Sequence, residues 1–251
     1  MRKSFLPLAL SAALVSSFAF FKVRAGEKDP VAPFADTVTS LQHIAAEEAK
    51  EATSAAAMAL YQQLNLEALG LSFDALQYAY KGYQNLLAQG KISNADVLTI
   101  CDFSQSSAQK RMYILDVAKG KVLLNTFVAH GKNSGLDYAT RFSNKMESLQ
   151  SSLGFYVTKA TYHGKHGLSL KLDGQDRGWN DRAEQRAVVV HGAEYIGSSR
   201  KNAAYMGRSF GCPAVPQHQA ATVINYIKNG TCLFIYHPTQ AYLNGSNVLN
   251  G

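Results

Sequence analysis

The chain has 251 residues, of which 47% are hydrophobic and 17% charged, and its formal net charge is +7. This length and composition suit one globular domain of ordinary size with a proper core. The basic charge does not indicate nucleic-acid binding, because no basic and aromatic patch and no recognisable nucleic-acid motif accompanies it.

The N-terminus has the pattern of a secretory signal peptide over residues 1–25. Two basic residues precede an apolar run over residues 5–21, and a small-residue cleavage pattern ends at Ala25. Lys22 and Arg24 lie unusually close to that site, so an uncleaved anchor is the alternative, although the run is short for a transmembrane helix. Cleavage would remove four basic residues and leave a mildly basic protein. We therefore expect export to the periplasm or cell envelope, with no stable membrane insertion after signal removal.

Residues 26–92 are predicted to form an N-terminal helical segment. Apolar residues recur every three or four positions over residues 36–64, which indicates one amphipathic helix or two short ones. A second helix is expected to begin after Ser72, a suitable N-cap, and to end at Gly90. Packing against the following domain is the expected role of these helices, and substrate recognition is the alternative.

From residue 93 the hydrophobic pattern becomes that of β-strands, and residues 93–240 are predicted to form the catalytic domain. A hairpin turn is expected at Lys119-Gly120 and an amphipathic helix over residues 217–228. The last stretch, residues 241–251, is predicted to be a polar and loosely held tail. The expected strands cover residues 97–101, 111–117, 121–129, 155–161, 168–172, 187–190 and 230–236.

Three cysteines are an odd number for an exported protein, so one thiol is free unless it pairs between chains. Cys212, in a turn flanked by glycine, is the natural free thiol. Cys101 and Cys232 lie in predicted strands, where two buried thiols are expected and a disulfide is the alternative. A lone reactive thiol is a liability in an oxidising compartment, and it is tolerated where the thiol has a task.

His191 and Cys212 are the candidate catalytic pair. His191 ends a β-branched run and Cys212 follows Gly211 in a turn 21 positions later. An imidazole can take the proton of a neighbouring thiol and so activate it as a nucleophile. The amides of Gly211 and Cys212 are candidates for an oxyanion hole. From residue types alone, a buried cysteine close to a core histidine is an equally good interpretation.

These motifs resemble the catalytic domain of the YkuD-like L,D-transpeptidases. His191-Gly192, a variable loop, an S-x-G-C turn at residues 209–212, a helix and a last strand follow the family's order, and HGA with GRSFGCPA resembles its murein L,D-transpeptidase branch. Residues 151–156 and 230–236 resemble two further family segments, so the resemblance covers roughly residues 97–236. It implies an α+β fold, with a mixed, mostly antiparallel β catalytic domain and an N-terminal helical segment.

Two departures from the common S-H-G-C motif concern substrate binding. Phe210 replaces the histidine of that motif, and Pro213-Ala214 stand where an arginine is expected. Arg208 is therefore the predicted substitute cation for a substrate carboxylate, with a surface salt bridge as the alternative. Ser209 is carried over from the motif, either to orient the imidazole or to contribute to the oxyanion site.

Two more residues complete the expected substrate-binding set. His166 lies in a GKHG segment that resembles this branch and is expected to face the cleft, and Gly192 is expected to line it. His163 and His166 also have the spacing of metal ligands, but no third ligand follows at a suitable distance, so no metal site is expected.

The resemblance implies cysteine-dependent transpeptidation of peptidoglycan stem peptides through a thioester acyl-enzyme, without a metal or organic cofactor. Cys212 would be the nucleophile, and His191 the general base and then the acid. The alternatives are an L,D-carboxypeptidase or endopeptidase that uses water, and a non-catalytic peptidoglycan-binding protein. A papain-like protease is disfavoured, because the histidine precedes the cysteine and both lie late in the chain. The sequence leaves the oligomeric state open.

Overall fold

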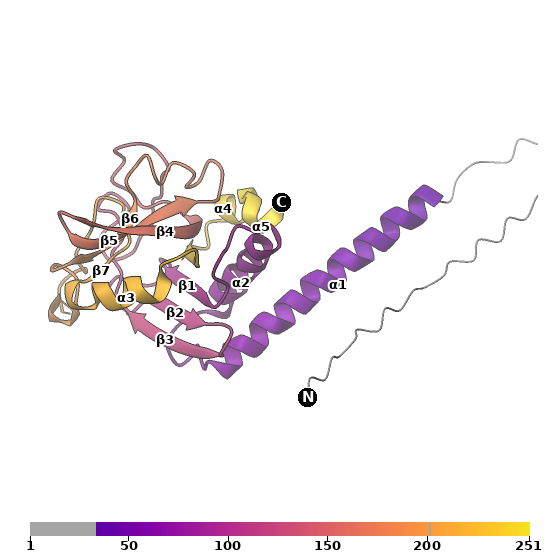
Figure 1. The fold of residues 1–251 in the computed structure, drawn as a ribbon, viewed down its shortest axis with the longest axis horizontal. Helices are drawn as coiled ribbons and strands as arrows, with labels where there is room; N and C mark the ends of the chain where they lie inside the picture. The colour runs from indigo at the N-terminus through magenta and orange to yellow at the C-terminus, as the bar shows by residue number, and fades with distance from the viewer. Residues whose placement is uncertain (1–33, 201) are drawn as a thin grey trace, which may run out of the picture. The chain divides into compact units, whose positions relative to one another are not determined.

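The computed structural model describes residues 34–200 and 202–251 (Figure 1). The predicted signal peptide at residues 1–25 lies outside the described residues. Within the described part, no helix is both long and apolar enough to cross a membrane. The contacts between residues divide the chain into two units, of which the second is Ala45–Gly251. The sheet and the helices that cover it belong to this second unit, and the first turns of helix α1 belong to the first.

Two helices precede the sheet, as predicted. Helix α1 runs without a break over Phe34–Gln63, so the pattern of residues 36–64 belongs to one helix and not to two. Helix α2 covers Phe73–Ala88, and the Ser72 hydroxyl caps it by accepting the Ala75 N–H. The apolar stripe of α2 contacts strands β1 (Val97–Asp102) and β8 (Cys232–Tyr236). Its buried members are Ala75, Leu76, Ala79, Tyr83 and Leu86.

Eight strands form one mixed sheet in the order β3-β2-β1-β8-β4-β5-β6-β7. Five of the seven pairings are antiparallel, and only β1–β8 and β6–β7 are parallel. This confirms the α+β class with a mostly antiparallel catalytic domain. The six other strands are β2 (Met112–Asp116), β3 (Lys121–Thr126), β4 (Gly154–Gly164), β5 (Gly167–Gly174), β6 (Val189–Ala193) and β7 (Ala214–Pro216).

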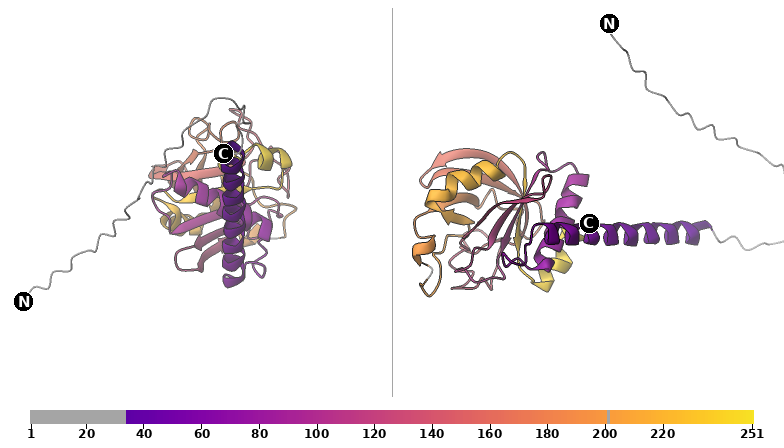
Figure 2. Two further views of the ribbon diagram at one scale, coloured as in Figure 1. Left: turned by 90° about the vertical axis from the view of Figure 1, so that its right-hand side faces the viewer. Right: turned by 90° about the horizontal axis from the view of Figure 1, so that it is seen from below.

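The two edges of this sheet come close to each other. The chain after β3 makes an isolated bridge from Ala129 to Ala214 in β7, and a second from Gly131 to Ser209. The sheet is therefore curved and nearly closed, and the right-hand view of Figure 2 shows its curvature. Because the closing bridges lie at residues 209 and 214, the turn that carries Cys212 is held between two contacts with the opposite edge.

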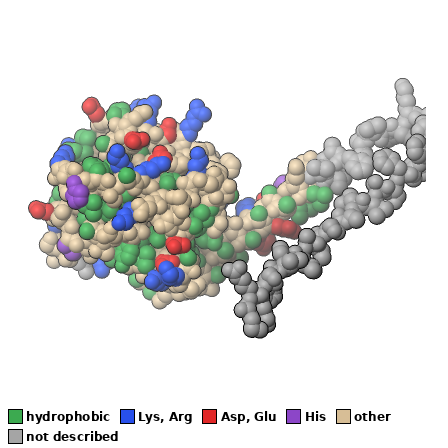
Figure 3. Space-filling view, viewed as in Figure 1, with side chains coloured by type: hydrophobic (Ala, Val, Ile, Leu, Met, Phe, Trp, Pro, Cys, Tyr) green, Lys and Arg blue, Asp and Glu red, His purple; other side chains and the backbone are tan. Residues whose placement is uncertain are grey.

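The core lies between the sheet and the helices that cover it. Every residue of β1, β2, β6 and β8 is buried. Helix α3 (Ala220–Ile227) follows a short 3₁₀ turn, η2 (Gln217–Gln219), and contacts β5, β6 and β1 with four buried apolar side chains. This pair of elements is the helix predicted over residues 217–228. On the face shown in Figure 3, basic and acidic side chains are interspersed.

Cys101 and Cys232 are buried free thiols, which confirms the expectation of two unbridged cysteines. In the parallel pairing of β1 with β8, Cys232 lies beside Leu98, whereas Cys101 lies beside Ile235. The offset of three positions directs the two side chains to opposite faces of the sheet. A disulfide between them would need the strands to separate, so the alternative drawn from the sequence is wrong.

The prediction of a loosely held tail at residues 241–251 is also wrong. Helices α4 (Gln240–Gly245) and α5 (Asn247–Asn250) end the chain, and α5 contacts α2. Their attachment depends on Asp176, a buried carboxylate that accepts hydrogen bonds from the Tyr242 and Ser246 hydroxyls and from the Val248 amide. Tail sequence alone gave no sign of this anchor, because the carboxylate lies more than sixty positions upstream.

Asp176→Asn is expected to destabilise the fold strongly. The carboxylate also accepts the Phe155 amide of β4, and an amide group would turn a donor toward some of these four donors. Loss of hydrogen bonds to a buried charged group predicts a fall in the free energy of unfolding of about 2–4 kcal/mol, measured by urea denaturation. Asp173→Asn is the matched control, because it removes only a surface ion pair with Lys159, worth less than about 1 kcal/mol. Equal losses in both variants would contradict the anchoring role of Asp176.

Candidate active site

His191 lies inside strand β6, between Ser169 of β5 and Ala214 of β7. Its side chain is buried, and Nδ1 lies 2.8 Å from the carbonyl oxygen of Gly192. A carbonyl only accepts, so Nδ1 carries the proton and Nε2 of the neutral ring is left as the basic nitrogen. The backbone of His191's own strand thus orients the imidazole and fixes its tautomer.

Gly192 has a packing role as well. A Cβ atom at this position would lie 2.5 Å from Oε1 of Gln217 and 2.9 Å from Cβ of Ala220. The glycine therefore allows η2 and the start of α3 to pack directly on β6. The structure fills the space beside Gly192 with protein atoms, and the residue reaches the candidate site through its carbonyl group.

Ser209 organises the turn that carries Cys212. Its Oγ donates to the carbonyl of Cys212 at 2.6 Å and accepts the amide of Gly211 at 3.0 Å. Its own amide and carbonyl bond to the backbone of His130 and Lys132 on the opposite edge of the sheet. The hydroxyl of Ser209 thus makes its hydrogen bonds within the turn and not to the imidazole. One of these bonds occupies the amide of Gly211, which was a candidate for the oxyanion hole.

Cys212 is partly buried, and its thiol donates to the carbonyl of Ala187, just before β6, at 3.6 Å. Burial raises the pKa of this thiol above its ordinary value, against the opposing effects of a Val189 backbone hydrogen bond and the charges of Arg186 and Lys165. The β6–β7 register pairs His191 with Ala214, two positions beyond Cys212. Cys212 therefore lies in the turn that enters β7, the strand that pairs with the strand of His191.

Burial lowers the pKa of His191, and the charges of His166 and Lys165 lower it further, while the hydrogen bond to Gly192 opposes them. A raised thiol pKa and a lowered imidazole pKa both favour the uncharged forms. The resting state at neutral pH is therefore a thiol and a neutral imidazole, and not a preformed ion pair. In that state the imidazole is able to accept a proton.

His166 lies at the tip of the hairpin formed by β4 and β5, in the two-residue turn between Gly164 and Gly167. Its ring stacks on that of His191 with the centroids 4.3 Å apart and the planes 22° from parallel. The tip of this hairpin, where His166 was expected to face the cleft, thus reaches the candidate base. Within residues 34–200 and 202–251, no three His, Cys, Asp or Glu side chains are grouped so that they could hold a metal ion.

Arg208 contacts the loop of residues 132–135, which follows the edge strand β3. Its Nη1 donates to the carbonyls of Lys132 at 2.8 Å and Gly135 at 3.1 Å, and its guanidinium carbon lies 4.6 Å from the ring centroid of Tyr205. None of the ion pairs found in the described part of the chain involves Arg208. The surface salt bridge that was its alternative role is therefore absent from these residues.

Sequence reasoning missed Arg186, which lies in the polar loop before β6. Its half-buried side chain bonds to the loop of residues 143–152, and Nη2 would lie 3.3 Å from a Cβ atom at Gly211. This arginine belongs to no motif, and a basic residue in a polar loop is ordinarily expected to be exposed to solvent. Only the fold brings it beside Cys212.

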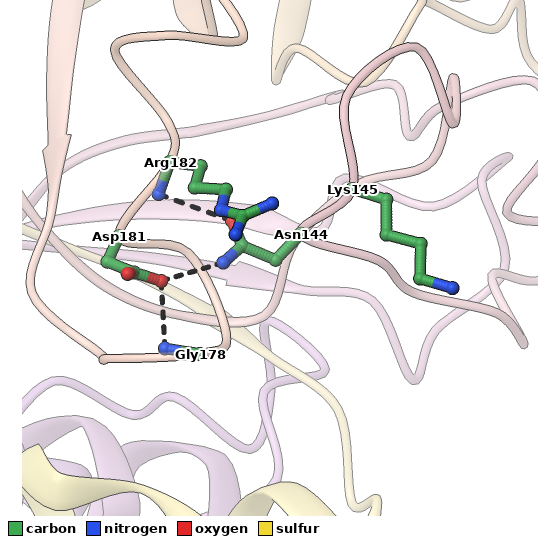
Figure 4. A pocket seen from close by; sticks show the side chains of 5 residues that line it. All are labelled: Asn144, Lys145, Gly178, Asp181 and Arg182. Atoms are coloured by element: carbon green, nitrogen blue, oxygen red, sulfur yellow. Dashed lines mark hydrogen bonds between the residues drawn. The ribbon is translucent and has the colours of Figure 1, made fainter.

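The loops of residues 143–152 and 175–187 also line a polar pocket away from the candidate pair (Figure 4). Asp181 accepts the amide of Gly178 and the side-chain amide of Asn144, whose Oδ1 accepts the Arg182 amide. In Figure 4 the Lys145 side chain points away from this network. The pocket thus reflects how the two loops are joined, and neither Cys212 nor His191 lines it.

Gly211→Ala is expected to disrupt the turn. The backbone φ of Gly211 is +125°, and a Cβ atom would lie 2.8 Å from the carbonyl oxygen of Gln150. Strain and clash together predict a loss of about 2 kcal/mol or more in the free energy of unfolding, and slower alkylation of Cys212 by iodoacetamide. Gly178→Ala separates the two causes, because φ there is +81° with nothing within 4 Å of the added atom. If Gly211→Ala alkylates at the rate of the unaltered protein, the turn tolerates a side chain and its tight fit is not needed.

Comparisons with known proteins identify one family. The family model described as "L,D-transpeptidase catalytic domain" matches residues 67–236, more than half of the chain. Similar solved structures include an L,D-transpeptidase from Mycobacterium smegmatis (15% identity, TM-score 0.36, covering 57% of this chain and 59% of that one). Another is the helical cell shape determining protein Pgp2 from Campylobacter jejuni (14% identity, TM-score 0.37, covering 64% and 57%). The chain covers less than two thirds of either structure, and no curated protein matches it.

Proposed function

Because the chain belongs to the L,D-transpeptidase catalytic domain family, we propose that it is a cysteine-dependent L,D-transpeptidase that acts on peptidoglycan stem peptides. The observation that supports the proposal is the pairing of His191 in β6 with Ala214 in β7, two positions after Cys212, together with the hydrogen bond that orients the imidazole. Peptidoglycan lies outside the cytoplasm, so the proposal includes export through the predicted signal peptide at residues 1–25.

The proposed reaction begins when Cys212 attacks the carbonyl carbon of an L-residue in a donor stem. Nε2 of His191 takes the thiol proton as the carbon–sulfur bond forms, and the imidazolium then protonates the leaving D-residue amine. A thioester acyl-enzyme remains. An amine of an acceptor stem attacks it, gives its proton to His191, and the thiol of Cys212 is regenerated. No metal or organic cofactor takes part.

The uncharged resting pair affects how the thiol is activated. Since the pKa of Cys212 is raised and that of His191 is lowered, the thiolate is not the resting form and arises only when His191 takes the thiol proton. The developing oxyanion needs a donor in the turn. The Gly211 amide is bonded to Ser209, so we assign this role to the amide of Cys212, with Gly211 providing the close backbone approach.

The substrate side of the proposal involves the hairpin tip and Arg208. His166, stacked on His191, would contact the donor stem near the scissile bond, and Gly192 would act through the orientation of His191. Arg208 has neutral backbone acceptors and no carboxylate partner in the described ion pairs. Its charge is therefore available to a stem carboxylate.

Incubation of the purified protein with sacculi rich in tetrapeptide stems tests the reaction, with mass analysis of the muropeptides. Cross-links through an L-centre are the expected product, and Cys212→Ala should abolish them while leaving the urea midpoint near its original value. Cys232→Ala is the control, because this buried thiol should affect stability and not chemistry.

Other products would point to the alternatives. Shortened stems without cross-links would identify an L,D-carboxypeptidase, and cleaved cross-links an endopeptidase, both with water as the acceptor. Retention on sacculi without any chemical change would identify a non-catalytic peptidoglycan-binding protein. Cross-linking by the Cys212→Ala variant at the original rate would overturn the mechanism.

Arg208→Ala is expected to lower kcat/KM for tetrapeptide donors by about 100-fold. A charge-assisted hydrogen bond to a carboxylate is worth about 1.5–3 kcal/mol, and a poorly solvated one somewhat more. Arg208→Lys should recover only part of the loss, because an ammonium group lacks the two-pronged geometry. Alkylation of Cys212 by neutral iodoacetamide serves as the control and should change little. Equal losses in turnover and alkylation would show that Arg208 acts through the loop that it binds and not on substrate.

A further inference from the structure

Arg186 is a cation without a counter-ion among the described ion pairs. Nη1 donates to the Ser143 carbonyl and the Ser152 hydroxyl, while Nη2 donates to the Ser148 hydroxyl and the Gln150 carbonyl. All four acceptors are neutral. Both terminal nitrogens of the guanidinium are thus hydrogen-bonded, while no described ion pair neutralises its charge. A half-buried charge in this state has lost solvation, and burial indeed lowers its pKa.

This charge lies beside the reacting thiol. The carbonyl that accepts the Cys212 thiol belongs to Ala187, the next residue after Arg186. The Gln150 carbonyl, 2.7 Å from Nη2, is the same oxygen that a Cβ atom at Gly211 would approach within 2.8 Å. Arg186 therefore holds the loop of residues 143–152 directly against the turn of Gly211 and Cys212.

We propose, on the basis of the function proposed above, that Arg186 is a positioning residue that supplies the counter-charge for the Cys212 thiolate and holds the 143–152 loop against its turn. A guanidinium keeps its charge at every pH of interest. The negative charge that appears when Cys212 loses its proton is the partner that Arg186 lacks in the resting state. Pro213 and Ala214, which follow the cysteine, carry no charge.

Other groups around the thiol have to be considered. Lys165 reaches it from the β4–β5 hairpin tip, His191 lies in β6, and Tyr195 follows β6 and interacts electrostatically with Cys212. Lys165 is the only other cation that interacts with the thiol in the described residues, and it is exposed. Solvent screens an exposed charge more than a half-buried one, so Arg186 is the stronger of the two cations.

The test measures the rate at which iodoacetamide alkylates Cys212 as a function of pH, which requires only the thiol and no transpeptidation. In Arg186→Gln the apparent pKa of the thiol should rise by about one unit or more. Arg186→Lys, which keeps the charge, should recover at least half of this shift. Arg182→Gln, an exposed arginine of the same loop that lines the pocket in Figure 4, should leave the profile unchanged.

Two readouts keep the test decisive. An unchanged profile in Arg186→Gln, or an equal shift in Arg186→Lys, overturns the proposal. Cys101 and Cys232 report on folding, because these buried thiols react only if the variant opens. If the Arg186→Gln variant unfolds, a second measurement replaces it, in which Arg186 is kept and Lys165 is replaced. In the Lys165→Gln variant, the rate of alkylation of Cys212 by iodoacetate is divided by the rate with iodoacetamide. A ratio above that of N-acetylcysteine amide supports the proposal, and an equal or lower ratio overturns it.

Discussion

The candidate site depends on the way Ser209 closes the turn before Cys212. Its hydroxyl accepts from Gly211 and donates to Cys212, while its backbone bonds to the opposite edge of the sheet. One residue thus sets the shape of the turn and also its place on the nearly closed sheet. A rigid turn matters because a small displacement of a nucleophile has a large effect on its rate of attack. This explains why the hydroxyl is used for positioning and not for contact with the imidazole.

The electrostatics of the site would suit a thiol in an exported protein, which is the location proposed for this chain. Oxidants attack the thiolate, so a raised pKa keeps an idle cysteine in its less reactive form. The lowered pKa of His191 keeps a proton acceptor ready at the same time. The thiol of such a site is unreactive at rest, and nearby cations and bound substrate are needed to activate it. This would suit a nucleophile outside the reducing cytoplasm.

Local patterns in the sequence predicted most of the sheet and helix α2, because strand and helix periodicity is local. The motif spacing also singled out His191 and Cys212, whose catalytic roles stay a prediction. Features that depend on distant contacts were not predictable in this way. Asp176 anchors helices that begin more than sixty positions later, and Arg186 reaches Cys212 only through the fold. The closing helices looked like a polar tail, because their few apolar residues form a stripe too short for a periodic signal.

Phe210 stands where the common motif has a histidine, yet a second histidine lies beside His191. Phe210 is 67% exposed, and Nζ of Lys132 lies 4.9 Å from its ring centroid, so this position contributes an apolar face to the surface. A second imidazole nevertheless lies at the site, because the β4–β5 hairpin places His166 on His191. Burial is the main cause of the lowered pKa of His191, and the charge of His166 lowers it further. A residue of another element thus adds to the effect of burial, and the position of the hairpin tip becomes part of the electrostatics of the candidate site.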